Sequence, residues 1–282
     1  MRRISDMRDE MLTVRERGFT LIEALVVIMV TGIVAAGVAI FMRGTVQSYF
    51  DSARRAELSD IADTAARRVA RDIQSALPNS VRVSGTGFLE LVPIRAAGRY
   101  RMEKGVSAAD DPLDFSDPAD GAFDVLGLAV SVANGDAIVI FNMGQPGADV
   151  YEGSSRRNAA APFGAVTHVT YSPGGTQFPF ASPGARFQVV NTAISYACDL
   201  ANGRLWRYSR YAIQAVQPTS LVDLDNLDPV EKSLVASNLT ACSFAYTGGT
   251  LERNGLVVMQ LAITEQGETV NLQHQIGVVN TP

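Results

Sequence analysis

One ionisable residue, Glu23, lies inside an otherwise apolar run that extends from Phe19 to Met42. A carboxylate in a low-dielectric environment forms strong ion pairs, but it is costly there without a cationic partner. On membrane-insertion scales a charged residue at the centre of a helix costs about 2.5–3.5 kcal/mol. Glu23 is therefore the first candidate functional residue, and its expected chemistry is ion pairing rather than catalysis.

The apolar run has the length and the flanks of a membrane-spanning helix. A helix over this run would be about 36 Å long, which exceeds a hydrocarbon core of roughly 30 Å. Arg15 and Arg17 precede the run, and only Arg43 follows it closely. The positive-inside rule predicts a single-pass inner-membrane protein with a cytoplasmic N-terminus and a periplasmic remainder.

The start of the run belongs to a longer motif, Arg17-Gly18-Phe19-Thr20-Leu21-Ile22-Glu23-Ala24-Leu25. This stretch resembles the processing site of type IV prepilins and type II secretion pseudopilins. The resemblance implies that a prepilin peptidase/N-methyltransferase cleaves the bond between Gly18 and Phe19 and methylates Phe19. It also implies that Glu23, the fifth residue of the mature chain, is the assembly glutamate. A plain signal anchor, in which Glu23 has no role, is the alternative.

Cleavage would create the cation that Glu23 lacks. The new N-terminal amine would be protonated at neutral pH if its pKa stays near the ordinary value of about 8. In a growing fibre the amine of an incoming subunit could pair with Glu23 of its neighbour and fix their register. This is a hypothesis, and efficient entry of Glu23→Ala subunits into the fibre would contradict it.

Other residues offer little catalytic chemistry. His168 and His274 have no Cys or carboxylate close by in sequence, so both are interpreted as structural. Six aspartates share one short stretch: Asp110, Asp111, Asp114, Asp117, Asp120 and Asp124. Their spacing does not match an EF-hand, so a solvated loop is preferred to a calcium site. We expect no enzyme activity, no cofactor and no metal.

Trp206, Tyr208 and Tyr211 alternate as on a half-exposed strand. Packing within a sheet is the preferred interpretation, although a sugar- or partner-binding face has the same pattern.

The two cysteines, Cys198 and Cys242, fall in predicted strands of the exported part. Export to an oxidising compartment favours a disulfide between them over two buried thiols. Closing a loop of that length would stabilise the fold by about 4 kcal/mol on the chain-entropy model.

Helical periodicity continues beyond the apolar run and ends before Pro78. Apolar residues recur every three or four positions from Leu58 to Leu77, while charged residues occupy the other faces. The sequence therefore predicts one helix from about Phe19 to Leu77. The basic cluster between Arg67 and Arg71 is interpreted as a solvated face, with a lipid-headgroup or partner site as the alternative.

After Pro78 the pattern changes to short β-branched and aromatic runs between turns. The sequence predicts hairpins around Gly85–Gly87, around Asn202-Gly203 and around Gln266-Gly267. Further strands are expected at 137–141, 166–171 and 187–190, and a short helix within 220–237 with Pro229 near its start.

These elements predict an α+β, type IV pilin-like fold in which a long N-terminal helix packs on an antiparallel β-rich domain. The expected segments are a cleaved cytoplasmic leader over 1–18, a transmembrane and polymerisation helix over 19–42, an exported amphipathic helix over 43–78 and a globular domain over 79–282.

Three later stretches carry a second resemblance: SARRAELSDIADTAARRVARDIQSALPNSVRV, YACDLANGRLWRYSRY and VNLQHQIGVVNTP. They resemble the minor pilin-like subunits of the mannose-sensitive haemagglutinin (MSHA) pilus, which are related to the J-type minor pseudopilin of type II secretion. The resemblance implies a structural subunit that helps to initiate or cap pilus assembly. The alternative is a minor pseudopilin of a secretion system, and an adhesin role at the pilus tip is also compatible.

The implied partners are the prepilin peptidase, other minor and major pilin subunits, the inner-membrane assembly platform and, before assembly, the lipid bilayer. Nucleic acid is not expected, because the net charge is −5 and no dense Lys/Arg cluster is present.

Overall fold

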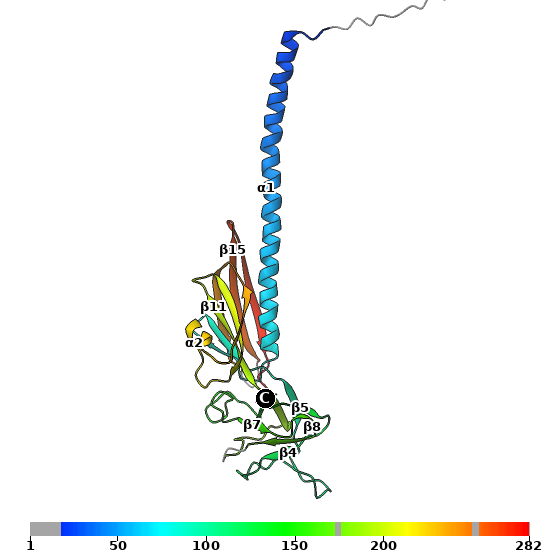
Figure 1. The fold of residues 1–282 in the computed structure, drawn as a ribbon, viewed down its shortest axis with the longest axis vertical. Coiled ribbons are helices and arrows are strands. Elements are labelled where there is room, and N and C mark those ends of the chain that lie inside the picture. Colours follow the sequence, from blue (N-terminus) through cyan, green and yellow to red (C-terminus); the bar gives the residue numbers. More distant parts are fainter. Residues whose placement is uncertain (1–17, 173–175, 250–253, 282) are drawn as a thin grey trace, which may run out of the picture. The chain divides into compact units, whose positions relative to one another are not determined.

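The computed structural model describes residues 18–172, 176–249 and 254–281, so all of the expected leader (1–18) except Gly18 lies outside the described residues. A single long helix, α1 (Leu21–Gln74), is followed by antiparallel sheets (Figure 1). This is the predicted α+β architecture. By contacts the chain divides into two compact units, Met1–Ala53 and Arg54–Pro282.

In the first unit, the described side chains of α1 are not buried in a hydrophobic core. All residues from 18 to 50 are exposed, including large apolar side chains such as Leu21 and Phe41. The mean hydropathy of the most apolar 18-residue window of α1 is 2.7, and none of that window is buried. Among the described residues, α1 is the one helix long and apolar enough to cross a membrane.

α1 ends three residues before the predicted end at Leu77. Ser75 still bonds back to the carbonyl of Arg71, but the Leu77 N–H donates to the carbonyl of Val92 at 2.7 Å. Pro78 disfavours helical backbone at Leu77. The chain therefore leaves the helix after Gln74 and pairs with the segment at Val92 and Pro93.

The second unit contains a five-stranded sheet. Its order is β1 (Arg82–Ser84), β2 (Phe88–Leu91), β11 (Thr192–Asp199), β12 (Arg204–Ala212) and β13 (Glu231–Ala236). The predicted hairpins β1–β2 and β11–β12 are both present. Gly85 and Gly203 adopt positive φ in the two turns, which other residues rarely adopt.

A three-stranded sheet follows in the order β14 (Leu239–Thr247), β15 (Gly255–Glu265) and β16 (Glu268–Val278). The β15–β16 register runs without interruption from Gly255–Val278 to Glu265–Glu268. Gln266 and Gly267 both have positive φ, as a tight two-residue turn requires. The terminal hairpin is therefore confirmed.

One face of α1 and both sheets share a core. Along the helix the buried residues are spaced three and four apart: Leu58, Ala62, Ala65, Ala66, Val69, Ala70 and Ile73. They pack with Leu89, Tyr196, Phe244 and Met259 of the sheets. This confirms the apolar stripe predicted for the second half of the helix.

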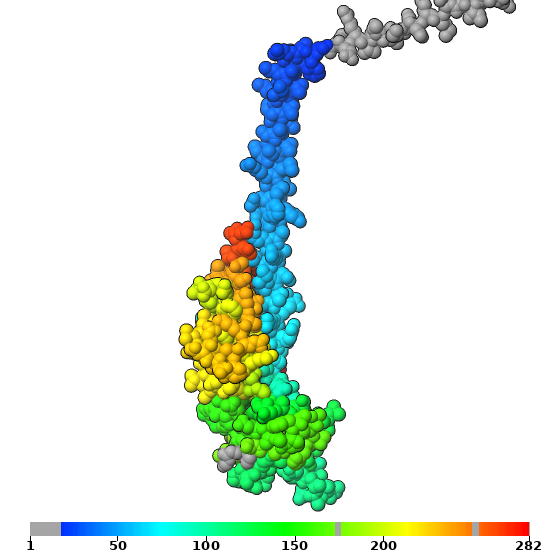
Figure 2. Space-filling model, viewed as in Figure 1, coloured from blue at the N-terminus to red at the C-terminus, as the bar shows by residue number. Residues whose placement is uncertain are grey.

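Between β2 and β11 the chain builds a separate group of strands, coloured green in Figure 2. Six strands pair in the order β3 (Ala96–Arg99), β10 (Arg186–Val190), β6 (Ala137–Val139), β7 (Arg156–Ala160), β9 (His168–Tyr171) and β4 (Ala122–Asp124). β5 (Val130–Val132) pairs with β8 (Gly164–Val166). An aromatic core centred on Phe123, Tyr171 and Phe187 fills this inserted segment.

The helix expected within 220–237 is wrong in its extent. α2 covers only Leu221–Asp225, with Ser220 as its N-cap, and it ends before Pro229. The later residues form β13 instead, which pairs with β12 from Ser209–Glu231 to Leu205–Ala236. Pairing with a neighbouring strand, which local sequence does not reveal, decides the conformation of this segment.

Candidate functional site

The candidate site lies at the start of α1, where Thr20 caps the helix. The N–H of Glu23 donates to Thr20 Oγ1 at 3.3 Å, and the N–H of Ala24 donates to the Thr20 carbonyl at 3.1 Å. The spacing Thr-x-x-Glu is that of a capping box. A carboxylate in the first turn is also favoured by the helix dipole. The helix start that carries Glu23 is thus fixed by local hydrogen bonds.

The bond between Gly18 and Phe19 lies just outside this helix. Gly18, Phe19 and Thr20 are non-helical and exposed, and a methyl group placed on Gly18 would have no neighbour within 4 Å. The Phe19 side chain is 74% exposed. The geometry therefore leaves this peptide bond exposed and places Glu23 about one helical turn after Phe19.

Glu23 is exposed and belongs to a helix whose neighbouring side chains are apolar and exposed as well. An exposed apolar surface of this extent marks a membrane or protein contact. In either environment a carboxylate requires a cationic partner. The surroundings of Glu23 therefore suit ion pairing with a group from another molecule.

Cys198 of β11 and Cys242 of β14 form a disulfide, with their Cα atoms 5.8 Å apart. Cys242 is buried in the core beneath α1. Next to the disulfide, the Phe244 N–H donates to the Thr86 carbonyl at 2.7 Å. The disulfide therefore joins the five-stranded sheet to the three-stranded sheet where β14 passes the β1–β2 turn.

In the acidic stretch from Asp110 to Asp124, many carboxylate oxygens accept hydrogen bonds from the same loop. The carboxylates of Asp114, Asp117 and Asp120 accept hydrogen bonds from backbone N–H groups two to six residues away, and all three are exposed or half-exposed. Hydrogen bonds from Ser116 hold the pKa of Asp114 below its ordinary value. Over the described ranges, no three His, Cys, Asp or Glu residues are grouped so that they could hold a metal ion.

His168 has no carboxylate close by in sequence, but the fold brings two carboxylates close to it in space. His168 Nδ1 lies 3.1 Å from Asp124 Oδ1, and Nε2 lies 3.7 Å from Asp111 Oδ2. Pairing of β9 with β4 places Asp124 opposite His168, and the Asp124 N–H donates to the Asp111 carbonyl at 2.8 Å, which keeps Asp111 close by. Arg101 also bonds Asp124, at 3.1 Å, so the group is a half-exposed ion-pair cluster.

Sequence reasoning missed a buried carboxylate, Glu90. Its oxygens accept from Arg82 Nε at 2.6 Å and from the Tyr211 hydroxyl at 2.8 Å, and Ser195 Oγ lies 2.6 Å from that hydroxyl. Burial raises the pKa of Glu90, against the opposing effects of Arg82 and Tyr211. Glu90 is fully buried, so it is not open to a substrate.

The expected alternation of Trp206, Tyr208 and Tyr211 is interrupted by a bulge. The β11–β12 register shifts between Ala193 and Ser195, and Arg210 has a positive φ. Tyr208 and Tyr211 are therefore both fully buried, whereas Trp206 is half-buried with Lys232 over its ring at 4.7 Å. The bulge turns Tyr211 inward to Glu90.

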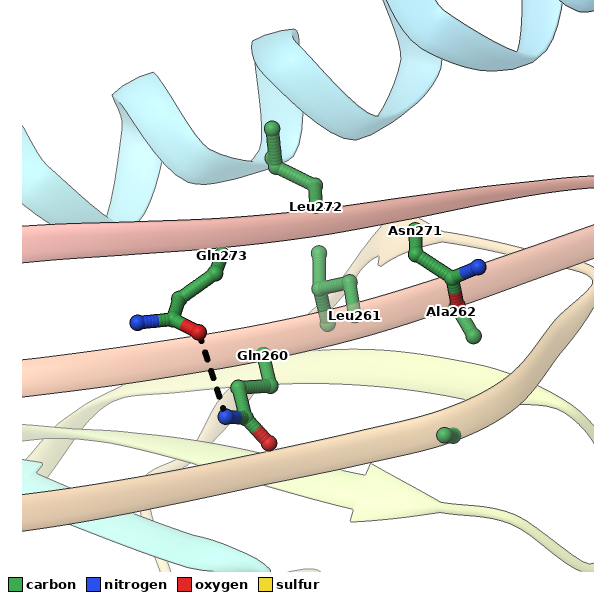
Figure 3. A pocket seen from close by; sticks show the side chains of 7 residues that line it. Gln260, Leu261, Ala262, Asn271, Leu272 and Gln273 are labelled. Carbon is green, nitrogen blue, oxygen red and sulfur yellow. Dashed lines mark hydrogen bonds between the residues drawn. The ribbon is translucent and has the colours of Figure 1, made fainter.

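A shallow hollow of about 310 Å³ lies on the outer face of β14, β15 and β16 (Figure 3). Its lining is neutral: Ala241, Gln260, Leu261, Ala262, Asn271, Leu272 and Gln273. Gln260 Nε2 donates to Gln273 Oε1 at 3.5 Å. A lining of amides and apolar side chains supplies no nucleophile, acid or base, so the hollow has the chemistry of a contact surface.

Residues 14–39 match a family described as the prokaryotic N-terminal methylation motif. No curated protein and no solved structure matches the chain. The matched range includes Gly18, Phe19 and Glu23 and ends within the apolar half of α1. Proteins that carry this motif are generally structural subunits rather than enzymes. The motif and the α+β fold together indicate a type IV pilin- or pseudopilin-like protein that is processed by a prepilin peptidase and associates with other pilins.

Proposed function

We propose that the chain is a minor pilin-like subunit, of the type called MshO, that helps to initiate or cap assembly of an MSHA-type type IV pilus. The observation that carries the proposal is the methylation motif over 14–39, which ends in an exposed apolar helix with Glu23 in its first turn. The later resemblance to MSHA minor subunits supplies the choice of pilus.

In this proposal the prepilin peptidase cleaves after Gly18 and methylates Phe19. Cleavage removes the leader and leaves a cationic amine one turn before Glu23. The amine of one subunit pairs with Glu23 of the next, and the apolar helix exchanges lipid for neighbouring helices. An unpaired Glu23 would be costly in that environment, so the pair favours one register over others.

The first test is the mass of the mature N-terminus. The exported protein should begin at an N-methylated Phe19, whereas a Gly18→Glu variant should stay unprocessed. A Glu23→Ala variant should be processed normally but should enter the fibre far less efficiently, because the pairing carboxylate is missing. Glu103→Ala removes an exposed carboxylate from a loop and serves as the matched control. A mature chain that retains residues before Phe19 would contradict the proposal.

The second test separates the two systems that use this motif. Deletion of the gene should abolish or reduce piliation and leave protein secretion intact, and the wild-type gene should restore piliation. Loss of secretion with normal piliation would instead assign the chain to a J-type minor pseudopilin of a type II secretion system. Neighbouring genes for pilus biogenesis would agree with the first outcome.

A further inference from the structure

β16 forms a free edge of the three-stranded sheet. It is the last strand in the order β14-β15-β16, and within the part of the chain that the structure describes it pairs with β15 alone. Glu265 and Glu268 close the two-residue turn, so the Glu268 N–H belongs to the ladder with β15. Because ladder bonding alternates along an antiparallel strand, the odd-numbered residues from Thr269 to Gly277 direct their N–H and C=O groups away from β15. β16 therefore presents a row of free backbone donors and acceptors.

The side chains of β16 leave this edge accessible from both faces. The odd-numbered residues from Thr269 to Gly277 are all exposed on the outer face. On the inner face Val270 and Leu272 are only half-buried, whereas Ile263 and Leu261, the residues opposite them on β15, are buried. Figure 3 shows α1 beyond β16, on the side away from β15. A strand added to β16 would therefore continue the sheet along α1 and cover these half-buried side chains.

The edges formed by β13 and β14 are protected against such pairing, and β16 is not. Proteins protect edge strands by short length, charge, proline, bulges or a covering segment. β13 has 6 residues, begins with Glu231 and Lys232, and pairs with β12 through a register shift. The β1–β2 turn lies against β14, where the Phe244 N–H bonds the Thr86 carbonyl. β16 has 11 residues in unbroken register, with no Asp, Glu, Lys, Arg or Pro between residues 269 and 278.

β16 runs in the same direction as the second half of α1. Arg55 pairs with Glu268 at the start of the strand, and Asn79, which follows α1, donates to the carbonyl of Asn280 at 3.3 Å. Antiparallel pairing of β16 with β16 of a second copy would therefore set the two helices in opposite directions. In the proposed function all copies are anchored in one membrane by the start of α1, so their helices have the same polarity. A second copy does not fit this edge in that arrangement.

We propose that β16 accepts an extended segment of a different pilin subunit as an added antiparallel strand. The proposal rests on the proposed function, which supplies the shared membrane and the association with other subunits. Strand addition would satisfy the free backbone groups of β16, and antiparallel pairing is the more stable of the two directions.

The side chains along the edge define the chemistry of that segment. Asn271 and Gln273 are exposed and uncharged on the outer face, so the partner residues beside them are uncharged polar residues. Alternate residues of the partner point to the other face, where they meet Val270 and Leu272 and are small or apolar. The segment is therefore an alternating, charge-free strand rather than a charged or proline-rich one.

Site-specific photo-cross-linking tests the added strand by its register. The full-length protein, expressed with the assembly machinery, carries one photoreactive phenylalanine analogue in place of Thr269, Asn271, Gln273 or Gln275. Mass spectrometry maps each adduct to a residue of the partner. For an antiparallel strand, each step of two residues along β16 should move the adduct about two residues back along one partner segment.

Ala245 is the control position for binding to the outer face instead of the edge. It is exposed on β14, two strands away from the free edge of β16. That distance is about 10 Å at 4.7–4.9 Å per strand, so the analogue at Ala245 should give on the order of tenfold less adduct with the same segment. Equal yields from Ala245 and Gln273 would mean a contact with the face of the sheet and would overturn the proposal.

A pair of substitutions at Gln273 separates backbone pairing from side-chain contact. Gln273→Pro removes a free N–H without removing a bond to β15, and an edge strand tolerates proline at such a position. With the analogue at Asn271, this variant should reduce the adduct on the order of tenfold, because a strand bond is lost and the edge is distorted. Gln273→Thr keeps the N–H and should retain the yield within about twofold. Urea unfolding followed by Trp206 fluorescence checks that both variants fold, and equal yields from two folded variants overturn backbone pairing.

The mass of the N-terminus, measured in the same cells, separates this inference from the proposed function. Protein that is processed at Phe19 but shows no stepwise register overturns strand addition and leaves the proposed function in place. The stepwise register in a chain that retains residues before Phe19 contradicts the proposed function alone. Adducts only with a second copy, or only with a protein that is not a pilin, also overturn the inference. Stepwise adducts with one segment of another pilin, lost in Gln273→Pro and kept in Gln273→Thr, support it.

Discussion

The two units of the chain differ in whether the chain itself buries their apolar side chains. Residues 18–50 are all exposed and make no core, although most of them are apolar. The unit from Arg54 onward contains three buried clusters, a disulfide and a buried ion pair, all supplied by the chain itself. The first unit therefore needs a bilayer or other subunits to cover it, whereas the second can fold on its own contacts.

This contrast explains why a short motif carries the functional information. In the proposed function, processing and pairing in the first unit depend on residues close together in sequence, from Gly18 to Glu23. The second unit depends on contacts between residues far apart. Urea unfolding of variants of the full chain in detergent can separate the contributions of the two units. Trp206, the one tryptophan, lies in β12 and reports unfolding of the second unit alone.

The largest expected effect is the loss of the disulfide. The Cys198→Ala/Cys242→Ala variant should lose about 4 kcal/mol of unfolding free energy on the chain-entropy model, because a 44-residue separation is no longer closed in the unfolded chain. Processing at Gly18 should not change, since the cysteines lie in the other unit. An unfolding midpoint equal to that of the oxidised wild type would show that the disulfide contributes no stability.

The next effect compares two isoleucines of the same helix. Ile73 is 2% exposed in the core beneath α1, and Ile28 is 74% exposed in the first unit. Ile73→Ala should lose about 2–5 kcal/mol, because it leaves a cavity among packed side chains. Ile28→Ala should change the unfolding free energy by less than about 0.5 kcal/mol. Equal losses at the two positions would mean that the units do not differ as described.

A smaller effect distinguishes two ion pairs of α1. Asp72 accepts from Arg207 Nε at 2.7 Å and from the Tyr196 hydroxyl at 2.7 Å, and both charged side chains are 18% exposed. Arg207→Ala should therefore lose about 2 kcal/mol, since the carboxylate stays largely buried without its cation. Arg67→Ala breaks the exposed pair with Asp63 and should lose only about 0.3–0.5 kcal/mol. A greater loss for Arg67→Ala would contradict this assignment.

Sequence predicted the features that local patterns determine. The helix, its buried stripe and the hairpins at Gly85, Gly203 and Gln266-Gly267 follow from periodicity and turn residues. The capping role of Thr20 was not predicted, although Thr-x-x-Glu before an apolar run is the pattern of a capping box. Gly18 and Phe19 were identified by resemblance, since nothing in their own chemistry marks a cleavage site.

Features that depend on distant strands were missed. The order β3-β10-β6-β7-β9-β4 joins strands that are not consecutive, so no local pattern contains it. His168 meets Asp124 only because β9 pairs with β4. Glu90 reads as the solvent-facing residue of an alternating strand, yet the bulge in β12 turns Tyr211 toward it and Arg82 neutralises it. The burial of Glu90 therefore depends on three segments together.

The smallest expected effect is a change in how the unfolding free energy depends on pH when Glu90 is replaced. Burial raises its folded-state pKa above the ordinary value of 4.5, so the native protein holds this proton more tightly than the unfolded chain does. The resulting stability is fully present below pH 4.5 and is lost as the pH rises through the raised pKa. The unfolding free energy of the wild type, measured between pH 4 and 8, should therefore fall relative to that of Glu90→Gln as the pH rises.

Asp225→Asn is a control in which the pH dependence has the opposite sign. The hydrogen bond from Lys232 lowers the pKa of Asp225, so the stability that Asp225 contributes is lost as the pH falls through that lowered pKa. Parallel pH profiles for wild type and Glu90→Gln would contradict the raised pKa and would mean that Arg82 and Tyr211 fully offset the effect of burial on Glu90.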